Sequence, residues 1–281
     1  MRIARCKVND ADVWTVVGDH SLRVLHGVED FGQAVALACG TDESRTQSIG
    51  DAVPLKFMHW LPPMLASTKI ICAGVNYAKH AAETARQGLQ YPSMFVRFAD
   101  SFVGHGEPVV RPRVTDSFDY EAELVVVIGR AGRHIPEDLA LEYVGGYTCM
   151  AENSARDYQK HNAQVTPGKN FDRSGSVGPW IVTPQTIPDP ETLVVTGRLN
   201  GGIVQQAGVR ELICPVARLI AYVSTFTTLR PGDMIATGTP EGVGASRKPP
   251  RFMQAGDVFE VNINGVGCLR NSVELEQEAN Q

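Results

Sequence analysis

The chain has 281 residues, of which 43% are hydrophobic and 20% are charged, and its formal net charge at pH 7 is −5. This composition is that of a globular protein with a substantial buried core, and the weakly acidic chain has no basic stripe for nucleic acid. No apolar run reaches the ~20 residues that a membrane-spanning helix needs, so we expect no membrane partner. We expect residues 1–14 to form a strand rather than a signal peptide, and the six scattered cysteines to stay reduced in a cytoplasmic protein.

The first 65 residues predict a small module of strands with one short helix. Apolar residues alternate at residues 3–6 and 13–17, which is typical of strands, and residues 31–39 have the spacing of a helix. Two successive prolines at residues 62–63 break both helix and sheet pairing. We therefore divide the chain into an N-terminal module, residues 1–65, and a larger domain, residues 66–281.

The larger domain is predicted to consist mostly of strands. Its predicted strands are residues 69–74, 123–129, 147–150, 180–183 and 234–236. Asn-Gly pairs at residues 200–201 and 264–265 stand between alternating apolar segments, which is a strong hairpin signal. One helix is expected at residues 216–226, with Pro215 at its start. Strands outnumber helices and do not alternate with them, so we expect an α+β fold with a mixed or antiparallel sheet.

Two glutamates at the start of the 123–129 strand predict a metal site. Residues two apart on a strand point to the same face, so Glu121 and Glu123 project together. Like charges at that range repel unless a cation neutralises them or one takes up a proton, and a divalent cation with oxygen ligands would neutralise both. The alternative is a solvated strand face, which is the commoner interpretation of an isolated pair.

A third carboxylate, Glu152, stands where the 147–150 strand ends. If a helix starts there, Arg156 and Gln159 lie one to two turns beyond it. Arg156, four residues on, would then pair with Glu152 as an ordinary ion pair on a helix surface, or both would face a site.

A histidine and a glutamate three residues apart predict a general base. Asn76 is placed to cap a helix that runs to Gly88, and on this helix His80 and Glu83 share one face. A carboxylate bonded to one ring nitrogen raises the basicity of the other, and such a pair can activate water. The alternative for His80 alone is an ordinary surface histidine.

Two glycine-containing segments predict ligand loops. Lys169 stands among small residues in segment 168–172, and Gly238 and Thr239 follow a buried strand in segment 237–244. Glycines let backbone N–H groups approach an anion closely. The second segment is not a P-loop, because no Gly-Lys-Ser/Thr sequence follows it.

Five ordered motifs make the combination recognisable. They are NYAKHAAE (76–83), FDYEAELVVVIG (118–129), GYTCMAENSARDYQ (146–159), GKNFDRSGSVGPWIV (168–182) and PGDMIATGTPEGVG (231–244). They resemble the fumarylacetoacetate hydrolase family over about residues 69–272, and residues 1–65 resemble the small N-terminal module of many members. The resemblance implies the family's mixed β-roll, within the α+β class, and a homodimer.

The resemblance assigns the three glutamates to a metal. Glu121, Glu123 and Glu152 match the acidic residues with which the family holds one Mg²⁺ or Mn²⁺ per chain. In most members, however, the third ligand is the Asp of an Asn-Asp pair, and here Ala151 and Glu152 stand in its place. Glu reaches one methylene further, and Mg²⁺ demands near-octahedral geometry. Glu152 therefore either ligates with altered geometry or swings away and weakens metal binding.

The resemblance also assigns the remaining candidates. His80 and Glu83 match the pair that activates water in the hydrolases, and Lys169 matches a lysine near the substrate oxygens. The expected substrate-binding residues are Arg156, Gln159, Gly238 and Thr239.

The implied function is hydrolysis of a carbon–carbon bond in an acylpyruvate-like 2,4-dioxo acid of aromatic catabolism, through a metal-stabilised enolate. The first alternative is a decarboxylase or an isomerase/tautomerase of 2-oxo diacids on the same site. The second is a catalytically silent small-molecule binder with a degraded metal site. The distal half of the substrate is not fixed by the motifs, and we expect residues 91–104 and 209–214 to shape that part of the pocket.

Overall fold

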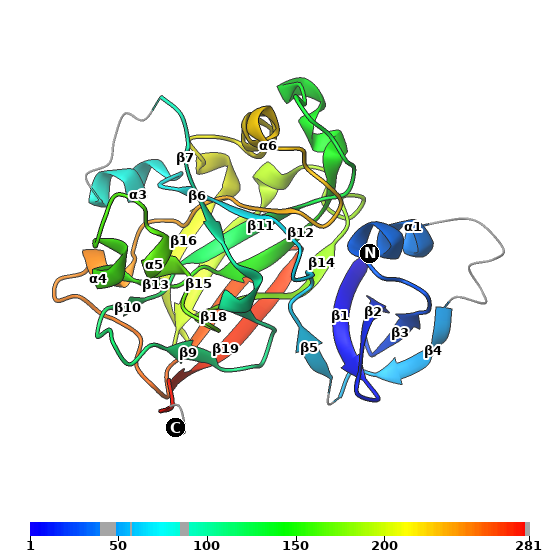
Figure 1. Ribbon diagram of the computed structural model, residues 1–281, viewed down its shortest axis with the longest axis horizontal. Helices are drawn as coiled ribbons and strands as arrows, with labels where there is room; N and C mark the ends of the chain where they lie inside the picture. The colour runs from blue at the N-terminus through cyan, green and yellow to red at the C-terminus, as the bar shows by residue number, and fades with distance from the viewer. Residues whose placement is uncertain (40–48, 57, 85–89, 279–281) are drawn as a thin grey trace.

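The computed structural model describes residues 1–39, 49–56, 58–84 and 90–278, which form a large mixed sheet packed against a smaller one (Figure 1). The twelve strands of the large sheet are β1 (Arg2–Val8), β2 (Ala11–Val17), β3 (Ser21–Leu25), β4 (Ile49–Pro54), β5 (His59–Leu61), β6 (Ile70–Gly74), β7 (Ser93–Arg97), β8 (Phe102–Val103), β11 (Ala122–Ile128), β12 (Val144–Ala151), β14 (Gly175–Val182) and β17 (Met234–Ala236). Their order is β4-β3-β2-β1-β14-β12-β11-β17-β6-β7, with β5 paired to β1 and β8 paired to β14. Most neighbours are antiparallel, whereas β17 pairs with β6, and β14 with β8, in parallel.

The smaller sheet has five strands in the order β16-β15-β18-β19-β9. They are β9 (Val109–Arg111), β15 (Val194–Leu199), β16 (Gly202–Gly208), β18 (Val258–Ile263) and β19 (Gly267–Leu275). A separate short pair joins β10 (Phe118–Asp119) to β13 (Ser154–Ala155). The helices are α1 (Phe31–Cys39), α3 (Ala78–Glu83), α4 (Arg156–Gln159), α5 (Thr166–Lys169) and α6 (Val216–Phe226). The 3-10 turns are η1 (Ala99–Ser101), η2 (Glu137–Tyr143), η3 (Pro190–Thr192), η4 (Val209–Glu211) and η5 (Gly244–Ser246).

Apart from Glu123, the central strand β11 is apolar, and all of its residues are buried. Leu124 and Val126 belong to the core that also contains Phe259 and Val261 of β18. On the opposite face, the alternate valines of β11 lie in the core that contains Phe31 of α1. Burying each such side chain contributes roughly 1.5–3 kcal/mol. This strand is therefore a rigid base for the residues at its start.

The structure confirms the predicted α+β class and most of the predicted elements. Asn200 and Gly201 form the turn of the β15–β16 hairpin, with positive φ values of 51° and 82°. The predicted helix is α6, and Pro215 is its N-cap. The hairpin predicted at residues 264–265 connects β18 to β19.

The helix prediction around residue 80 was partly wrong. Tyr77, not Asn76, is the N-cap of α3, and the described helix ends at Glu83. The Asn76 amide instead donates to the carbonyl oxygens of Cys214 and Thr237, at 3.0 and 2.8 Å, and so ties the 76 loop to the loop before α6. The predicted stop at residue 88 lies outside the described residues.

The N-terminal module and the larger domain share one sheet. Strand β1 pairs with β14, with Arg2 opposite Val182 and Ile3 opposite Ile181, so backbone hydrogen bonds continue across the predicted boundary (Figure 1). The division at residue 65 stays a prediction. Within the described ranges, the helices are too short or too polar to cross a bilayer.

Candidate metal centre and active site

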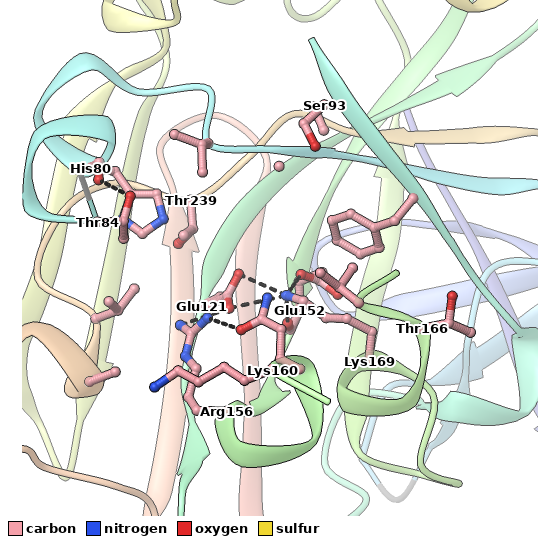
Figure 2. A pocket seen from close by; sticks show the side chains of 18 of the residues that line it. His80, Thr84, Ser93, Glu121, Glu152, Arg156, Lys160, Thr166, Lys169 and Thr239 are labelled. Atoms are coloured by element: carbon pink, nitrogen blue, oxygen red, sulfur yellow. Dashed lines mark hydrogen bonds and ion pairs between the residues drawn. The ribbon is translucent and has the colours of Figure 1, made fainter. Parts of the chain in front are cut away.

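A cavity of about 1030 Å³ brings together nearly all of the predicted site residues (Figure 2). Its lining is drawn from α3, β7, α4, α5 and the adjacent ends of β11 and β12. The predicted residues in this lining are His80, Glu83, Glu121, Glu123, Glu152, Arg156, Gln159, Lys169 and Thr239. In the part of the chain that the structure describes, Gly238 is the predicted residue that does not line the cavity.

The three glutamates converge because of the register of two strands. Strands β11 and β12 are antiparallel with Ala122 opposite Ala151, which places Glu121 and Glu152 side by side just beyond the paired ends. The Glu152 backbone N–H donates to the Glu121 carbonyl oxygen at 2.9 Å. One carboxylate oxygen from each of Glu121, Glu123 and Glu152 lies within 4.8 Å of the others, and all three residues are buried. The expected convergence of Glu121 and Glu123 is thus present in the structure, with Glu152 beside them.

Two buried cations neutralise part of this cluster. The Lys169 Nζ lies 3.1 Å from both oxygens of Glu121 and also contacts Glu152 Oε2, while Arg156 Nη2 lies 2.8 Å from Glu121 Oε1 (Figure 2). Ser154 Oγ donates to the same Glu121 oxygen at 2.6 Å. Burial alone would raise the pKa of Glu121, but the charges of Arg156 and Lys169 hold it well below its usual range. Glu121 is therefore ionised at neutral pH.

Glu123 is the carboxylate that the protein does not neutralise. Its Oε2 accepts a 2.9 Å hydrogen bond from the Gly238 backbone N–H, and no lysine, arginine or histidine of the described chain lies within ion-pair distance of it. Burial, together with the charges of Glu152 and Glu121, raises the pKa of Glu123 well above its ordinary value. The pKa of Glu152 is raised to about 7, chiefly by burial, although Lys169 opposes the shift.

This donor set fits a hard divalent cation. Three carboxylates offer oxygen ligands from one side of a cavity, and Mg²⁺ and Mn²⁺ prefer such ligands and keep further positions for water or substrate. The same cation would remove the repulsion that raises the pKa of Glu123. The geometry and the charge of the cluster therefore both suit a metal ion.

Glu152 points into the cluster. Its Oε1 lies 3.1 Å from Arg97 Nη1, its Oε2 contacts Lys169, and the side chains of Glu152 and Arg97 are both fully buried. Of the two alternatives for the longer glutamate, the metal-free geometry therefore matches the one in which the carboxylate stays in the site. Its role as a ligand is taken up below as a proposal.

The surface ion pair between Glu152 and Arg156 is not formed, because the helix starts later than expected. Helix α4 begins at Arg156, and Glu152 lies in the bend between β12 and β13. Arg156 turns toward the cavity instead, where its Nε lies 2.8 Å from Asp119 Oδ2 and its Nη2 lies 2.8 Å from Glu121 Oε1. Its Nη1 donates to Gln159 Oε1 at 3.0 Å, so Arg156 and Gln159 form one polar wall.

His80 and Glu83 form the expected pair on α3. His80 Nδ1 lies 2.7 Å from Glu83 Oε1, and the Gly242 backbone N–H donates to both oxygens of Glu83 at 3.2 and 3.1 Å. Burial raises the pKa of Glu83, but the hydrogen bonds from His80, Ser246 and Gly242 outweigh it and leave this pKa lowered. An ionised Glu83 fixes the Nδ1–H tautomer, so His80 Nε2 is the ring nitrogen that can accept a proton in the cavity.

The glycine-containing loop after β17 makes hydrogen bonds to the start of β11, beside the three glutamates. Thr239 Oγ1 donates to the Ala122 carbonyl oxygen at 3.0 Å and accepts from Gln205 Nε2 at 2.8 Å, which braces the start of β11. Gly238 has a φ of 102°, and its backbone N–H donates a hydrogen bond to Glu123 Oε2. The substrate-binding roles of Gly238 and Thr239 stay predictions, and the contacts seen here are structural.

The two segments expected to shape the distal pocket behave differently. From segment 91–104, the lining residues are Ser93, Met94, Phe95 and Val96. Segment 209–214 contributes none of the described lining residues. The cavity lining beyond the predicted site residues therefore includes β7 and residues 160 and 162–166.

Two charged residues of the site were missed. Arg97 pairs with Glu152 across 55 residues of sequence, and Asp119 pairs with Arg156 across 37. Asp119 is held by backbone N–H groups of the 244–245 turn, at 2.7 and 3.0 Å. A lone arginine at a strand end carries no local signal. Asp119, however, stands two residues before Glu121 on the same strand spacing, and this could have marked it.

These features define a class: an α+β protein in which a buried carboxylate cluster and a His–Glu pair line one cavity. Residues 69–274 match the C-terminal domain of fumarylacetoacetate (FAA) hydrolase. The chain therefore belongs to the fumarylacetoacetate hydrolase family.

Three similar proteins show the range of activities among its relatives. The mitochondrial oxaloacetate tautomerase fahd2 of Xenopus laevis is 42% identical over 215 residues, which are 76% of this chain and 67% of that protein. The fumarylacetoacetate hydrolase of Exiguobacterium antarcticum is 32% identical, with a TM-score of 0.85 over 98% of this chain and 100% of that one, and it confirms the predicted fold. The maleylpyruvate hydrolase of Sphingobium sp. SYK-6, solved with manganese(II) and pyruvate, is 28% identical, with a TM-score of 0.82 over 99% and 100% of the two chains.

Proposed function

We propose that this protein is a metal-dependent enzyme that converts a small 2-oxo acid through its enolate. The observation that carries the proposal is the placement of the His80–Glu83 pair and the three-glutamate cluster in the lining of one cavity. Glu121, Glu123 and Glu152 would hold one Mg²⁺ or Mn²⁺, which supplies a Lewis acid and a template for the 2-oxo and carboxylate oxygens of the substrate. The manganese and pyruvate bound by the similar maleylpyruvate hydrolase support this choice.

The side chains around the cluster supply proton transfer and charge stabilisation. His80, oriented by Glu83, takes up a proton at Nε2. Burial favours the neutral amine of Lys169, but the charges of Glu121 and Glu152 raise its pKa, so it stays an ammonium ion that stabilises negative charge on an enolate oxygen. Arg156, fixed by Asp119, orients an acidic substrate group.

The reaction we propose first is hydrolysis of a carbon–carbon bond in an acylpyruvate-like 2,4-dioxo acid. His80 removes a proton from water, and the hydroxide adds to the distal carbonyl carbon. The bond between that carbon and the methylene carbon then breaks, and its electron pair forms the enolate of pyruvate. Protonation of this enolate, by the proton that His80 took up, gives pyruvate and a carboxylic acid.

Tautomerisation of an oxaloacetate-type diacid is the second candidate, and the 42% identical relative named oxaloacetate tautomerase favours it. This reaction uses the same enolate but needs no attacking water. His80 would remove a proton from carbon 3 of the keto form, and this proton would then be delivered to the enolate oxygen to give the enol. We further propose that the protein is a cytoplasmic homodimer with one metal ion per chain, and all three properties stay predictions.

Turnover assays separate these reactions. The purified protein, loaded with Mn²⁺ or Mg²⁺, is assayed on acylpyruvates for release of pyruvate and on oxaloacetate for enol–keto exchange. Release of pyruvate supports hydrolysis, exchange alone supports tautomerisation, and neither activity with either metal would contradict the proposed function.

Replacing His80 by Ala tests the proton transfer. We expect this variant to lose about 10²–10⁴-fold in turnover, because the general base is removed, while Mn²⁺ binding stays unchanged. His59→Ala is a matched control, because His59 also pairs with a glutamate, Glu107, but does not line the cavity. Turnover of His80→Ala equal to wild type would exclude His80 as the base.

A further inference from the structure

We propose that Arg97 is the positioning residue that allows this chain to use a glutamate at position 152 as a metal ligand, and this inference rests on the proposed metal site. The two oxygens of the Glu152 carboxylate meet different cations: Oε1 lies 3.1 Å from Arg97 Nη1, and Oε2 contacts Lys169 inside the glutamate cluster. Arg97 thus holds Oε1, which leaves Oε2, the oxygen beside Lys169, free to face a metal. Glu152 then offers a single oxygen to the metal.

The Arg97 guanidinium is held in a site built for it. Its Nε lies 3.1 Å from Ser101 Oγ, its Nη2 lies 3.0 Å from Ser174 Oγ, and its Cζ lies over the Phe102 ring, 4.2 Å from the ring centroid. A Cβ on Gly175 would lie only 2.9 Å from Arg97 Nη1, so the absence of a side chain there makes room for the guanidinium. The contact with Glu152 is therefore made by a group that is already fixed.

A fixed partner matters more for a glutamate than for an aspartate. Glutamate has one more rotatable bond, so holding its carboxylate at a ligand position costs more side-chain entropy. A buried hydrogen bond from Arg97 orders the Glu152 side chain before the metal binds, so less side-chain entropy is lost on binding. Groups that hydrogen-bond to metal ligands generally act in this way. Lysine could supply the charge of Arg97 but not its planar fork, which here bonds Glu152, Ser101 and Ser174 at once.

Arg97→Lys tests this role, because the charge is retained while the fork is lost. Metal-stripped protein is titrated with Mn²⁺, and free Mn²⁺ is measured by electron paramagnetic resonance. We expect the Kd for Mn²⁺ to rise by about 10–100-fold. A Kd equal to or lower than that of wild type would overturn the role of Arg97. If wild type itself binds no Mn²⁺, the proposed function fails instead, so the two failures are distinguishable.

Glu152→Asp completes a double-mutant cycle. The shorter carboxylate cannot both reach Arg97 and stay in the cluster, so we expect Glu152→Asp to bind Mn²⁺ more weakly than wild type. Adding Arg97→Lys to it should change the Kd by no more than about twofold, because the contact is already lost. If Arg97→Lys weakens binding equally in both backgrounds, Arg97 acts through the fold and not through Glu152, and the inference is wrong.

Arg111→Lys is the matched control. Arg111 is a largely buried arginine that pairs with Asp116 and does not line the cavity. The Kd of the Arg111→Lys variant for Mn²⁺ should therefore equal that of wild type. Thermal unfolding without metal shows which variants fold. If Arg97→Lys is not recovered as a folded protein, Ser174→Ala takes its place in the cycle, because it removes the 3.0 Å contact that holds Arg97 Nη2. Weaker Mn²⁺ binding that disappears in the Glu152→Asp background supports the role of Arg97, and unchanged or equally weakened binding in both backgrounds overturns it.

Discussion

At the scale of single residues, the site is built from pairs that lie close together on one element and from pairs that join distant elements. Glu121 and Glu123 are two residues apart on a strand, and His80 and Glu83 are three apart on a helix, so their proximity follows from local geometry. Arg97 meets Glu152 only because β7 and the end of β12 are folded together. No spacing rule covers a pair separated by 55 residues.

Glu123 provides a test of the metal site through stability. Because this buried carboxylate has no cationic partner in the described chain, we expect Glu123→Gln to abolish Mn²⁺ binding and to stabilise the metal-free protein by about 1 kcal/mol. The corresponding rise in Tm is roughly 2–4 °C. Differential scanning calorimetry without metal, and titration with Mn²⁺, check the two effects.

Glu121→Gln is the control, and we expect its change in stability to be opposite in sign to that of Glu123→Gln. Glu121 is paired with Arg156 and Lys169, so its loss leaves two buried cations uncompensated and should destabilise the protein by about 3–5 kcal/mol. Both variants should fail to bind Mn²⁺. A Glu123→Gln variant that is less stable than wild type would show that burying the Glu123 carboxyl without a cationic partner carries no net cost in stability.

At the scale of elements, turns and apolar runs were predicted well, but helix ends were not. The Asn-Gly signal located the β15–β16 turn because positive φ is a local requirement. The start of α4 was misplaced by several residues, because β13 pairs with β10 and so keeps residues 154–155 extended. Likewise, the Asn76 side chain is taken up by distant carbonyl groups and does not cap α3.

The β15–β16 turn gives a prediction at this scale. Gly201 has a φ of 82° and nothing within 4 Å of an added Cβ, so Gly201→Ala should cost about 1 kcal/mol through backbone strain alone. Urea unfolding measures this cost. Gly202→Ala, one residue along in ordinary extended backbone, should be close to neutral. Equal stability of the two variants would argue against strain, and both should keep wild-type turnover, because neither residue lines the cavity.

At the scale of the whole molecule, the sequence predicted the α+β class but not the layout of its sheets. Five motifs indicated the family, and one family model covers residues 69–274. The pairing of β1 with β14, which extends one sheet from the N-terminal module into the rest of the chain, depends on strands about 180 residues apart and left no sequence signal. This sheet and the five-stranded sheet fix β11 and β12, and their paired ends fix the three glutamates.

The central claim is that Glu121, Glu123 and Glu152 together bind one divalent cation. Crystals grown with Mn²⁺ and measured at a wavelength where manganese scatters anomalously test this directly. We expect one anomalous peak per chain, within coordination distance of an oxygen from each of the three glutamates, with Lys169 displaced from its position between Glu121 and Glu152. An absent peak at this cluster, in crystals where Lys169 still bridges the two glutamates at saturating Mn²⁺, would contradict the claim.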